Sequence, residues 1–475
     1  MRTSGAQKPI VERFTLRGVH GYKDISIDFS GAATVIVAEN GTGKTTLLSA
    51  FNAFLSRRFH RLASLSFVEL ECKFYEYQSP IIVKRDELLT GQQDLTEMVL
   101  TIARDAAVSE DELLEFIVNS YSPENFYQFQ NHSLVHQLYV KTPGGIENAK
   151  RRLDELHSLY TGSLTNYAKR IISFLHGILE NIDIIFLPTY RRIERPMLRT
   201  SRKRKGARVH DELYFHSRIE KKEYAYEGIA FGLGDIEARL VELSEEIERT
   251  SNYGYRSWSA RILSDSLKGK SARPANGTED LPDIKTLSLF LGRLGPVENN
   301  LGEIFKNIGG LYDSGSIYSD EFEFLRYFLT GLNKVISQTK ALEQRIEHFV
   351  AVCNSYLTMS SDEKKLAFDP QTLTVFVQNS WANCTVPLDE LSSGEKQIVS
   401  LMAKLYLYDR HKFVLIDEPE LSLSISWQRK VLPDVLRSGS VVQLLAITHS
   451  PFVFENELDS SATGLKISRT GGAVR

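Results

Sequence analysis

The 475-residue sequence is poor in cysteine, in long apolar runs and in net charge. Its three cysteines, Cys72, Cys353 and Cys384, lie far apart and form no CxxC pair, which excludes a CxxC zinc site and a disulfide framework. No run of about 18 apolar residues is present, and the N-terminus has no apolar signal segment. The net charge of −3 excludes a general attraction to nucleic acid and leaves only local patches. We therefore expect a soluble cytoplasmic protein.

The sequence does contain enough apolar material for a large core. Hydrophobic residues make up 42% of the chain and aromatic residues 10%, and the length is sufficient for two or three domains. Apolar residues alternate over 9–29 and again over 67–84, which predicts two strand hairpins. Helical periodicity is typical of most of 97–180 and of 227–360.

A glycine-rich turn follows the short apolar run 34–37 and opens a helix. Gly41 and Gly43 let the backbone approach phosphates, whose charge the successive N–H groups and Lys44 would bind. The hydroxyl of Thr45 has the chemistry of an Mg²⁺ ligand. Ala38 replaces the first glycine of this pattern, at a cost of roughly 1 kcal/mol if its φ were positive. The expected nucleotide-binding residues here are Asn40, Gly41, Thr42, Gly43, Lys44, Thr45 and Thr46.

Three further motifs follow one another near the C-terminus. Residues 391–395 form a polar, glycine-containing turn before an apolar-periodic helix, whose first N–H groups favour an anion. The apolar run 413–416 ends on Asp417-Glu418, and the run 441–447 ends on Thr448-His449-Ser450-Pro451. In an open α/β sheet, ligands bind at the carboxyl ends of strands. These polar residues are therefore candidates for one site.

Together with the glycine-rich turn, these motifs resemble those of ATP-binding cassette (ABC) ATPases of the SMC/RecF/OLD-like branch. Leu391-Ser392-Ser393-Gly394-Glu395 matches the signature motif, with Ser393 where the commoner pattern has glycine. Asp417-Glu418 matches Walker B, 420–424 the D-loop, and His449 the switch histidine. The wording DEPEL…WQ and THSP is similar to that of ATPases from bacterial anti-phage systems, namely OLD-family, Septu-type and PARIS ATPases. The resemblance covers both ends of the chain well and its middle weakly.

The resemblance implies an α/β fold, an ABC-type P-loop ATPase head with a mixed sheet, helices on both faces and an N-terminal antiparallel β subdomain. A large helical insertion would interrupt it. The expected divisions are 1–96 and 371–475 for the two parts of the head, 97–195 for a helical segment with a return strand, and 196–370 for the insertion.

The resemblance also implies a role for each site residue. Thr45 and Asp417 would hold Mg²⁺ on ATP, and Glu418 would be the general base for the attacking water. His449 would contact the γ-phosphate, and Ser392 and Gly394 of a second protomer would complete the site in a head-to-tail dimer. Gln78 is the preferred third Mg²⁺ ligand, with Gln128 and Gln130 as alternatives. Tyr22 and Arg17 are candidates for contact with the adenine.

The middle of the chain carries two features that these motifs do not explain. Nine basic residues and one acid occupy 191–208, a tract that is either a solvated loop or a contact for a polyanion. Apolar stripes run through 236–247 and 332–353, and they predict either short antiparallel helix hairpins or faces for self-association.

The leading functional hypothesis is an ATPase that acts as sensor or scaffold in anti-phage defence. It would form homo-oligomers, at least dimers, respond to a phage protein or nucleic acid, and control a separate effector, a nuclease. The alternative is an ATP-gated, DNA-binding clamp of the RecF or SMC type for DNA repair or maintenance. An OLD nuclease is not expected, because little sequence for a TOPRIM domain follows His449.

Overall fold

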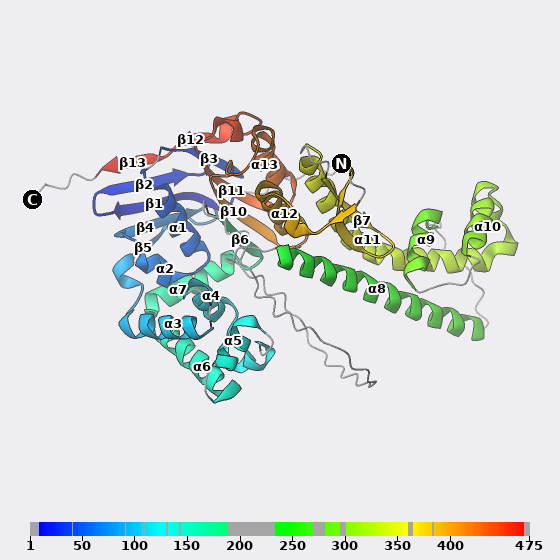
Figure 1. Cartoon of the computed structure of the whole chain (residues 1–475), viewed down its shortest axis with the longest axis horizontal. Coiled ribbons are helices and arrows are strands. Elements are labelled where there is room, and N and C mark those ends of the chain that lie inside the picture. The colour runs from blue at the N-terminus through cyan, green and yellow to red at the C-terminus, as the bar shows by residue number, and fades with distance from the viewer. Residues whose placement is uncertain are drawn as a thin grey trace, which may run out of the picture. The chain divides into compact units, whose positions relative to one another are not determined.

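Figure 1 shows the computed structural model of the chain. It describes residues 9–39, 41–90, 92–106, 108, 110–129, 132–141, 144–188, 233–268, 281–294, 301–359, 364–381 and 384–469. Contacts divide these residues into two compact units. Unit 1 comprises the described parts of Met1–Ala230 and Arg410–Arg475, and unit 2 comprises those of Phe231–Asp409.

A five-stranded parallel sheet forms the centre of unit 1. Its strands, in the order β12-β3-β11-β10-β6, are Ala462–Gly464, Ala33–Val37, Val441–Thr448, His411–Asp417 and Ile182–Leu187. Every neighbouring pair is parallel, and β11 is buried along its whole length. Burial on both faces explains why β3, β10 and β11 are nearly continuous apolar runs in the sequence. The parallel pairing also brings the carboxyl ends of β3, β10 and β11 to one edge.

An antiparallel sheet in the order β13-β2-β1-β4-β5 accompanies the parallel one. Its strands are Lys466–Arg469, Lys23–Asp28, Val11–Val19, Glu69–Phe74 and Ile81–Lys84. The alternation predicted for two hairpins produces a buried face, which packs on helix α1 (Lys44–Leu55). The rings of Phe14 and Phe51, for example, have centroids 4.4 Å apart.

Gln443 ties the two sheets of unit 1 together. It lies near the start of β11 and is fully buried. Its Oε1 accepts hydrogen bonds from the backbone N–H groups of Ile10 (2.8 Å) and Val11 (2.9 Å), and its Nε2 donates to the Val11 carbonyl (2.8 Å). A buried amide with its donor and acceptor both satisfied fixes the register of one sheet against the other.

The remaining helices of unit 1 come from between β3 and β6 and from between β10 and β11. The helical periodicity of 97–180 is confirmed, and Figure 1 shows the helices from that region gathered together in cyan. The helices of this region are α3 (Gln92–Ala106), α4 (Glu110–Asn119), α5 (Ser133–Lys141), α6 (Gly145–Ser163) and α7 (Asn166–Ile178). Unit 1 also contains α2 (Phe59–Ser64) and, near the C-terminus, α13 (Ile425–Arg437).

Unit 2 is built on two long antiparallel helices, α8 (Leu233–Leu267) and α11 (Glu323–Leu357), each of 35 residues. The unit also contains α9 (Ile284–Arg293), α10 (Leu301–Asp313), α12 (Ser393–Tyr406) and a three-stranded sheet of β7 (Lys364–Asp369), β8 (Thr374–Asn379) and β9 (Cys384–Val386). The predicted apolar stripes are buried within this unit, for example at Leu243, Ile247 and Phe349. Of the two alternatives for the stripes, the structure supports the helix hairpin.

Helices α8 and α11 approach closely at two glycines. A Cβ at Gly331 would lie 2.0 Å from the Cε2 and Cζ2 atoms of Trp258, and one at Gly254 would lie 2.5 Å from Val335 Cγ1. The Trp258 Nε1 donates to the Phe328 carbonyl at 3.2 Å, which holds the indole against α11. Both glycines are therefore explained by helix packing rather than by backbone conformation.

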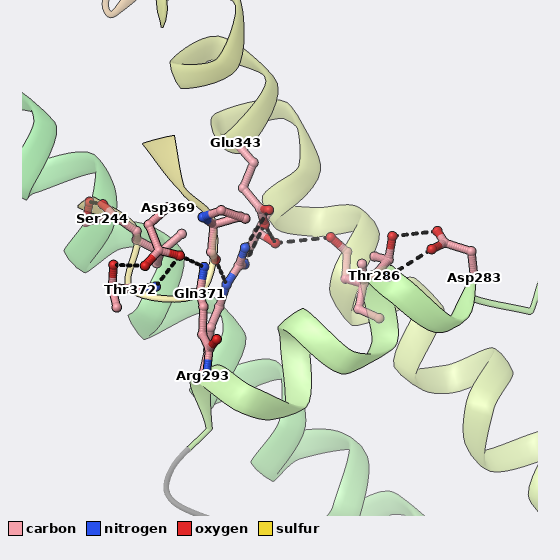
Figure 2. A network of polar contacts seen from close by, with 12 residues as sticks. Ser244, Asp283, Thr286, Arg293, Glu343, Asp369, Gln371 and Thr372 are labelled. Carbon is pink, nitrogen blue, oxygen red and sulfur yellow. Dashed lines mark hydrogen bonds and ion pairs between the residues drawn. The ribbon is translucent and has the colours of Figure 1, made fainter. Parts of the chain in front are cut away.

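A polar network joins α9, α11 and the turn between β7 and β8 (Figure 2). Arg293 donates from Nη1 and Nη2 to the two carboxylate oxygens of Glu343, each at 2.8 Å, and from Nε to the Pro370 carbonyl at 2.7 Å. Thr339 donates to the same carboxylate, and Asp283 caps α9. The Arg293 side chain is only 4% exposed, so its charge is compensated by a bidentate partner.

The fold class predicted from the sequence is confirmed. The structure is α/β and combines a parallel sheet, antiparallel sheets and many helices. None of the described helices combines the length and apolar character needed to cross a membrane.

The contact between Gly331 and Trp258 leads to a stability prediction. Gly331→Ala should lower the free energy of unfolding by about 1–3 kcal/mol, because the added methyl group overpacks the crossing of α8 and α11. Gly310→Ala in α10 is the matched control, since a Cβ there meets nothing within 4 Å. It should be neutral or stabilise by up to about 1 kcal/mol. Urea unfolding measures both; equal effects would contradict the packing role of Gly331.

Candidate nucleotide-binding site

The glycine-rich turn between β3 and α1 has the backbone conformation that its sequence requires. Gly41 and Gly43 have φ of 77° and 100°, in the left-handed region where a Cβ is unfavourable. Gly43 is the N-cap residue of α1, and a Cβ there would lie 2.6 Å from Ile25 Cδ1 of the antiparallel sheet. The N-terminus of α1 therefore presents backbone N–H groups where no side chain intervenes, as an anion site needs.

Ala38 and Lys44 lie at the two ends of this turn. Ala38 is not among the described residues with positive φ, so the conformational cost considered for alanine does not arise. Its carbonyl instead accepts a hydrogen bond from Lys44 Nζ at 3.2 Å. The Thr42 hydroxyl donates to the Glu39 carbonyl at 2.7 Å and closes the turn. Asn40, also predicted to bind nucleotide, lies outside the described residues.

Three polar side chains converge where the parallel strands end. Glu418 follows β10, and its backbone N–H donates to the Ile447 carbonyl of β11 at 2.8 Å. Its Oε1 lies 3.8 Å from the Nε2 of His449, which follows β11. The same Nε2 contacts Lys44 Nζ. The structure thus brings Glu418 and His449 together with Lys44, which lies 405 residues before His449 in the sequence.

The donor set beside these groups fits a magnesium ion. Asp417 ends β10 and is only 2% exposed, whereas Thr45 lies exposed in the first turn of α1. Hydroxyl and carboxylate oxygens are the ligands that Mg²⁺ prefers, usually with waters and substrate phosphates. Within the described chain, no group of three or more His, Cys, Asp or Glu side chains could hold a metal by itself. A metal at this edge would therefore depend on phosphate oxygens.

Gln78 is not brought to this site. It lies in the turn after β4, and Phe74 of β4 pairs with Val11 at the start of β1. The other end of β1 leads to Lys23, whose Nζ reaches the Gly41 carbonyl at 3.2 Å. The intervening strand spans roughly 26 Å at about 3.3 Å per residue. Gln78 therefore lies at the far end of the antiparallel sheet, and we do not expect it to bind Mg²⁺.

The two adenine candidates have different surroundings. Tyr22 is 43% exposed and stands beside Lys23, whose Nζ lies 5.1 Å from the ring centroid. The guanidinium of Arg17 is paired with Glu71 at 2.8 Å and with Glu69 at 3.4 Å. Tyr22 remains a candidate on the side of the glycine-rich turn, whereas Arg17 has an ordinary role in pairing neighbouring strands.

The signature segment begins α12 in unit 2. Ser392 is its N-cap and forms a capping box, in which the hydroxyl accepts from the Glu395 N–H (3.4 Å) and the Glu395 carboxylate accepts from the Ser392 N–H (2.7 Å). Glu395 is buried, and its Oε2 lies 3.6 Å from Lys364 Nζ. The hydroxyl hydrogen of Ser392 stays available for donation. Gly394 is buried in the first turn, whereas Ser392 and Ser393 are exposed.

Glu420 is a residue of this site for which the sequence predicted no individual role. Its carboxylate accepts hydrogen bonds from the Thr448 hydroxyl (2.8 Å) and from the backbone N–H groups of His449 (2.9 Å) and Ser450 (3.2 Å). In the sequence, Glu420 stands out only as the acidic residue two positions after Glu418 in the motif DEPEL. Its hydrogen-bond partners become apparent only from the parallel pairing of β10 and β11. Arg191 and the basic tract lie outside the described residues.

Comparisons with known proteins give partial matches. A family model described as "AAA domain" matches residues 13–132, and one described as "AAA domain, putative AbiEii toxin, Type IV TA system" matches residues 382–455. These segments contain the glycine-rich turn and the Walker B, D-loop and histidine motifs, respectively. The two AAA-domain models therefore match separate segments toward the two ends of the chain. No curated protein sequence matches it.

Solved structures also match, at low similarity. One is the Smc head domain of Pyrococcus furiosus with an extended coiled coil, bound to the C-terminal domain of ScpA, at 13% identity and a TM-score of 0.34 over 97% of this chain and 96% of that one. Another is an SmcHead bound to the C-winged helix domain of ScpA, at 12% identity and a TM-score of 0.33 over 97% and 98% of the two chains. At these scores the likeness supports no argument about this chain.

The position of Gly43 gives a prediction about the site. Gly43→Ala should weaken nucleotide binding about tenfold or more, because left-handed φ costs roughly 1 kcal/mol and the methyl group meets Ile25. Adding Ile25→Val removes the clashing Cδ1 atom and should restore part of the affinity. Gly31→Ala, where a Cβ meets nothing within 4 Å, is the control. Calorimetric titration with nucleotide measures the affinity of each variant. Unchanged affinity in Gly43→Ala would exclude this turn as the binding site.

Proposed function

We propose that the chain is an ATPase that binds MgATP and hydrolyses it to ADP and phosphate. The observation that supports this most strongly is the convergence of Lys44, Glu418 and His449 beside the N-terminus of α1. A cation, a carboxylate and an imidazole next to a backbone anion site are the groups that phosphoryl transfer to water requires. The two AAA-domain matches contain these residues and support the same conclusion.

Each residue would contribute a separate effect. The N–H groups of residues 41–46 and the ammonium group of Lys44 bind the phosphates and stabilise the charge that develops on them. The Glu418 carboxylate orients the attacking water and accepts its proton, a contribution of about 10²–10⁴-fold in rate. His449 donates a hydrogen bond to the γ-phosphate. Thr45 and Asp417 would hold Mg²⁺, which supplies further neutralisation of phosphate charge when bound.

Two substitutions separate binding from chemistry. Glu418→Gln keeps the size of the side chain but cannot accept a proton, so ATP affinity should persist while kcat falls about 10²-fold or more. Lys44→Ala should lose affinity itself. Glu457→Gln is a control, since Glu457 pairs with Arg437 on the surface. Affinity and steady-state turnover of all three should be measured. Wild-type turnover in Glu418→Gln would remove Glu418 from its role.

We further propose that two copies share each site, with Ser392 and Gly394 of one copy facing the nucleotide on the other. The N-terminus of α12 is capped by Ser392, which is exposed and has its hydroxyl hydrogen available. It is therefore suited to donate hydrogen bonds to a phosphate group. The resemblance of residues 391–395 to an ABC signature supports the head-to-tail arrangement.

Subunit mixing tests the shared site. Ser392→Asp retains a good N-cap but places a negative charge toward phosphate, so this variant should be inactive alone, as should Lys44→Ala. Their heterodimers contain one intact site, and mixing should restore part of the ATPase activity. Mixing Lys44→Ala with Glu418→Gln is the matched control, because both residues act on the same copy's nucleotide. Equal activity of the two mixtures, with subunit exchange demonstrated, would contradict sharing.

The biological role that we propose is control of a separate effector, a nuclease, in anti-phage defence. The DEPEL…WQ and THSP wording supports this role. An ATP-gated DNA clamp would use the same site chemistry. We favour control of an effector over a DNA clamp because the sequence motifs resemble those of anti-phage ATPases. The geometry of the site is compatible with both roles.

A further inference from the structure

The turn after Walker B reaches across to the end of the neighbouring strand through one carboxylate. Glu420 lies three residues beyond the end of β10, and its Oε2 accepts from the Thr448 hydroxyl at 2.8 Å. Its Oε1 accepts from the backbone N–H groups of His449 at 2.9 Å and of Ser450 at 3.2 Å. The three donors are the last residue of β11 and the two residues that follow it. The carboxylate therefore binds the backbone on both sides of the His449 side chain.

A second side chain supports the same connection. Gln428, in the first turn of α13, accepts from the Ser450 hydroxyl through Oε1 at 2.8 Å. Its Nε2 donates to the Leu423 carbonyl at 2.9 Å, so it also holds the turn that contains Glu420. The two sequence signatures DEPEL…WQ and THSP are thus in direct contact, through Glu420 and Gln428 on one side and residues 448–450 on the other.

The backbone conformation around Glu418 indicates why the turn needs these hydrogen bonds. Glu418 has φ of 50°, in the left-handed region, and Ser422 has φ of 62°. The turn therefore follows a strained path that needs support from outside itself. Hydrogen bonds to an ionised carboxylate are among the stronger ones in proteins. Without them, the 3.8 Å separation between Glu418 Oε1 and His449 Nε2 would depend on Gln428 and on the ends of two strands.

We infer that Glu420 is a positioning residue for ATP hydrolysis: its carboxylate fixes residues 448–450 and thereby aims the imidazole of His449 at the γ-phosphate, next to Glu418. This inference rests on the proposed ATPase function and assigns Glu420 a role that it exerts through the backbone of His449. Gln428 supports the same segment from the other side. A misplacement of about 1 Å at such a site costs on the order of 10²-fold in rate.

Kinetics of a variant series test the positioning role. Glu420→Ala should lower kcat about 10-fold to 100-fold and leave the affinity for ATP unchanged, because the phosphate-binding turn is untouched. Glu420→Gln keeps an oxygen acceptor for the two backbone N–H groups and should fall between wild type and Glu420→Ala. Glu457→Ala, which removes a surface carboxylate of the same unit, should match wild type.

A double-mutant cycle distinguishes positioning from general stabilisation. If Glu420 acts through His449, Glu420→Ala should cause no further loss of kcat in a His449→Ala background. Losses that multiply in the double variant would show that Glu420 acts independently of His449 and would overturn the inference. So would a kcat of Glu420→Ala equal to that of the Glu457→Ala control.

Hydrogen exchange tests the contact without any requirement for activity. The amides of His449 and Ser450 should exchange faster in Glu420→Ala than in wild type, and those in Glu457→Ala should not. Unchanged exchange in Glu420→Ala would overturn the inference. A wild-type chain that binds but does not hydrolyse ATP would contradict the proposed function and, with it, the catalytic purpose of the contact. The exchange result would then still decide whether Glu420 holds residues 448–450.

Discussion

The parallel pairing of β3, β11 and β10 is the constraint on which the site depends. Parallel neighbours place their carboxyl ends at one edge, so three short apolar segments bring their following residues together. Asp417 pairs with Ile447, and Thr448 pairs with Val37 immediately before the glycine-rich turn. The polar residues that follow these strands are then neighbours without any long side chain being required to reach. Lys44, Glu418 and His449 meet for this reason.

The antiparallel sheet contributes to the site from its other side. Gln443 fixes the start of β1 to β11, and β1 then runs toward the glycine-rich turn. Ile25 of β2 packs against Gly43, and Lys23 reaches the Gly41 carbonyl. The parallel sheet thus positions Glu418 and His449, while the antiparallel sheet packs against the glycine-rich turn. A side chain at Gly43 would collide with Ile25 of the antiparallel sheet.

Local patterns made much of this predictable from the sequence. The glycines of the turn, the apolar runs before Asp417 and His449, and the capping residues Ser392 and Glu395 each carry their information within a few residues. The fold class followed from them and is confirmed. The structure does not support Gln78 as an Mg²⁺ ligand, and the reason is topological. A hairpin has two ends, and the sequence does not show which end faces the site. Glu420 was missed since its partners lie 28 to 30 residues away across a strand pair.

We propose that one edge of the parallel sheet binds MgATP with the help of a second copy. A structure of Glu418→Gln with ATP and Mg²⁺ would test this proposal. We expect the β- and γ-phosphates over the N-terminus of α1, the metal on Thr45 and Asp417, His449 at the γ-phosphate, and Ser392 of another copy completing the site. Nucleotide bound elsewhere, or phosphates in place with every Ser392 distant from them, would contradict it.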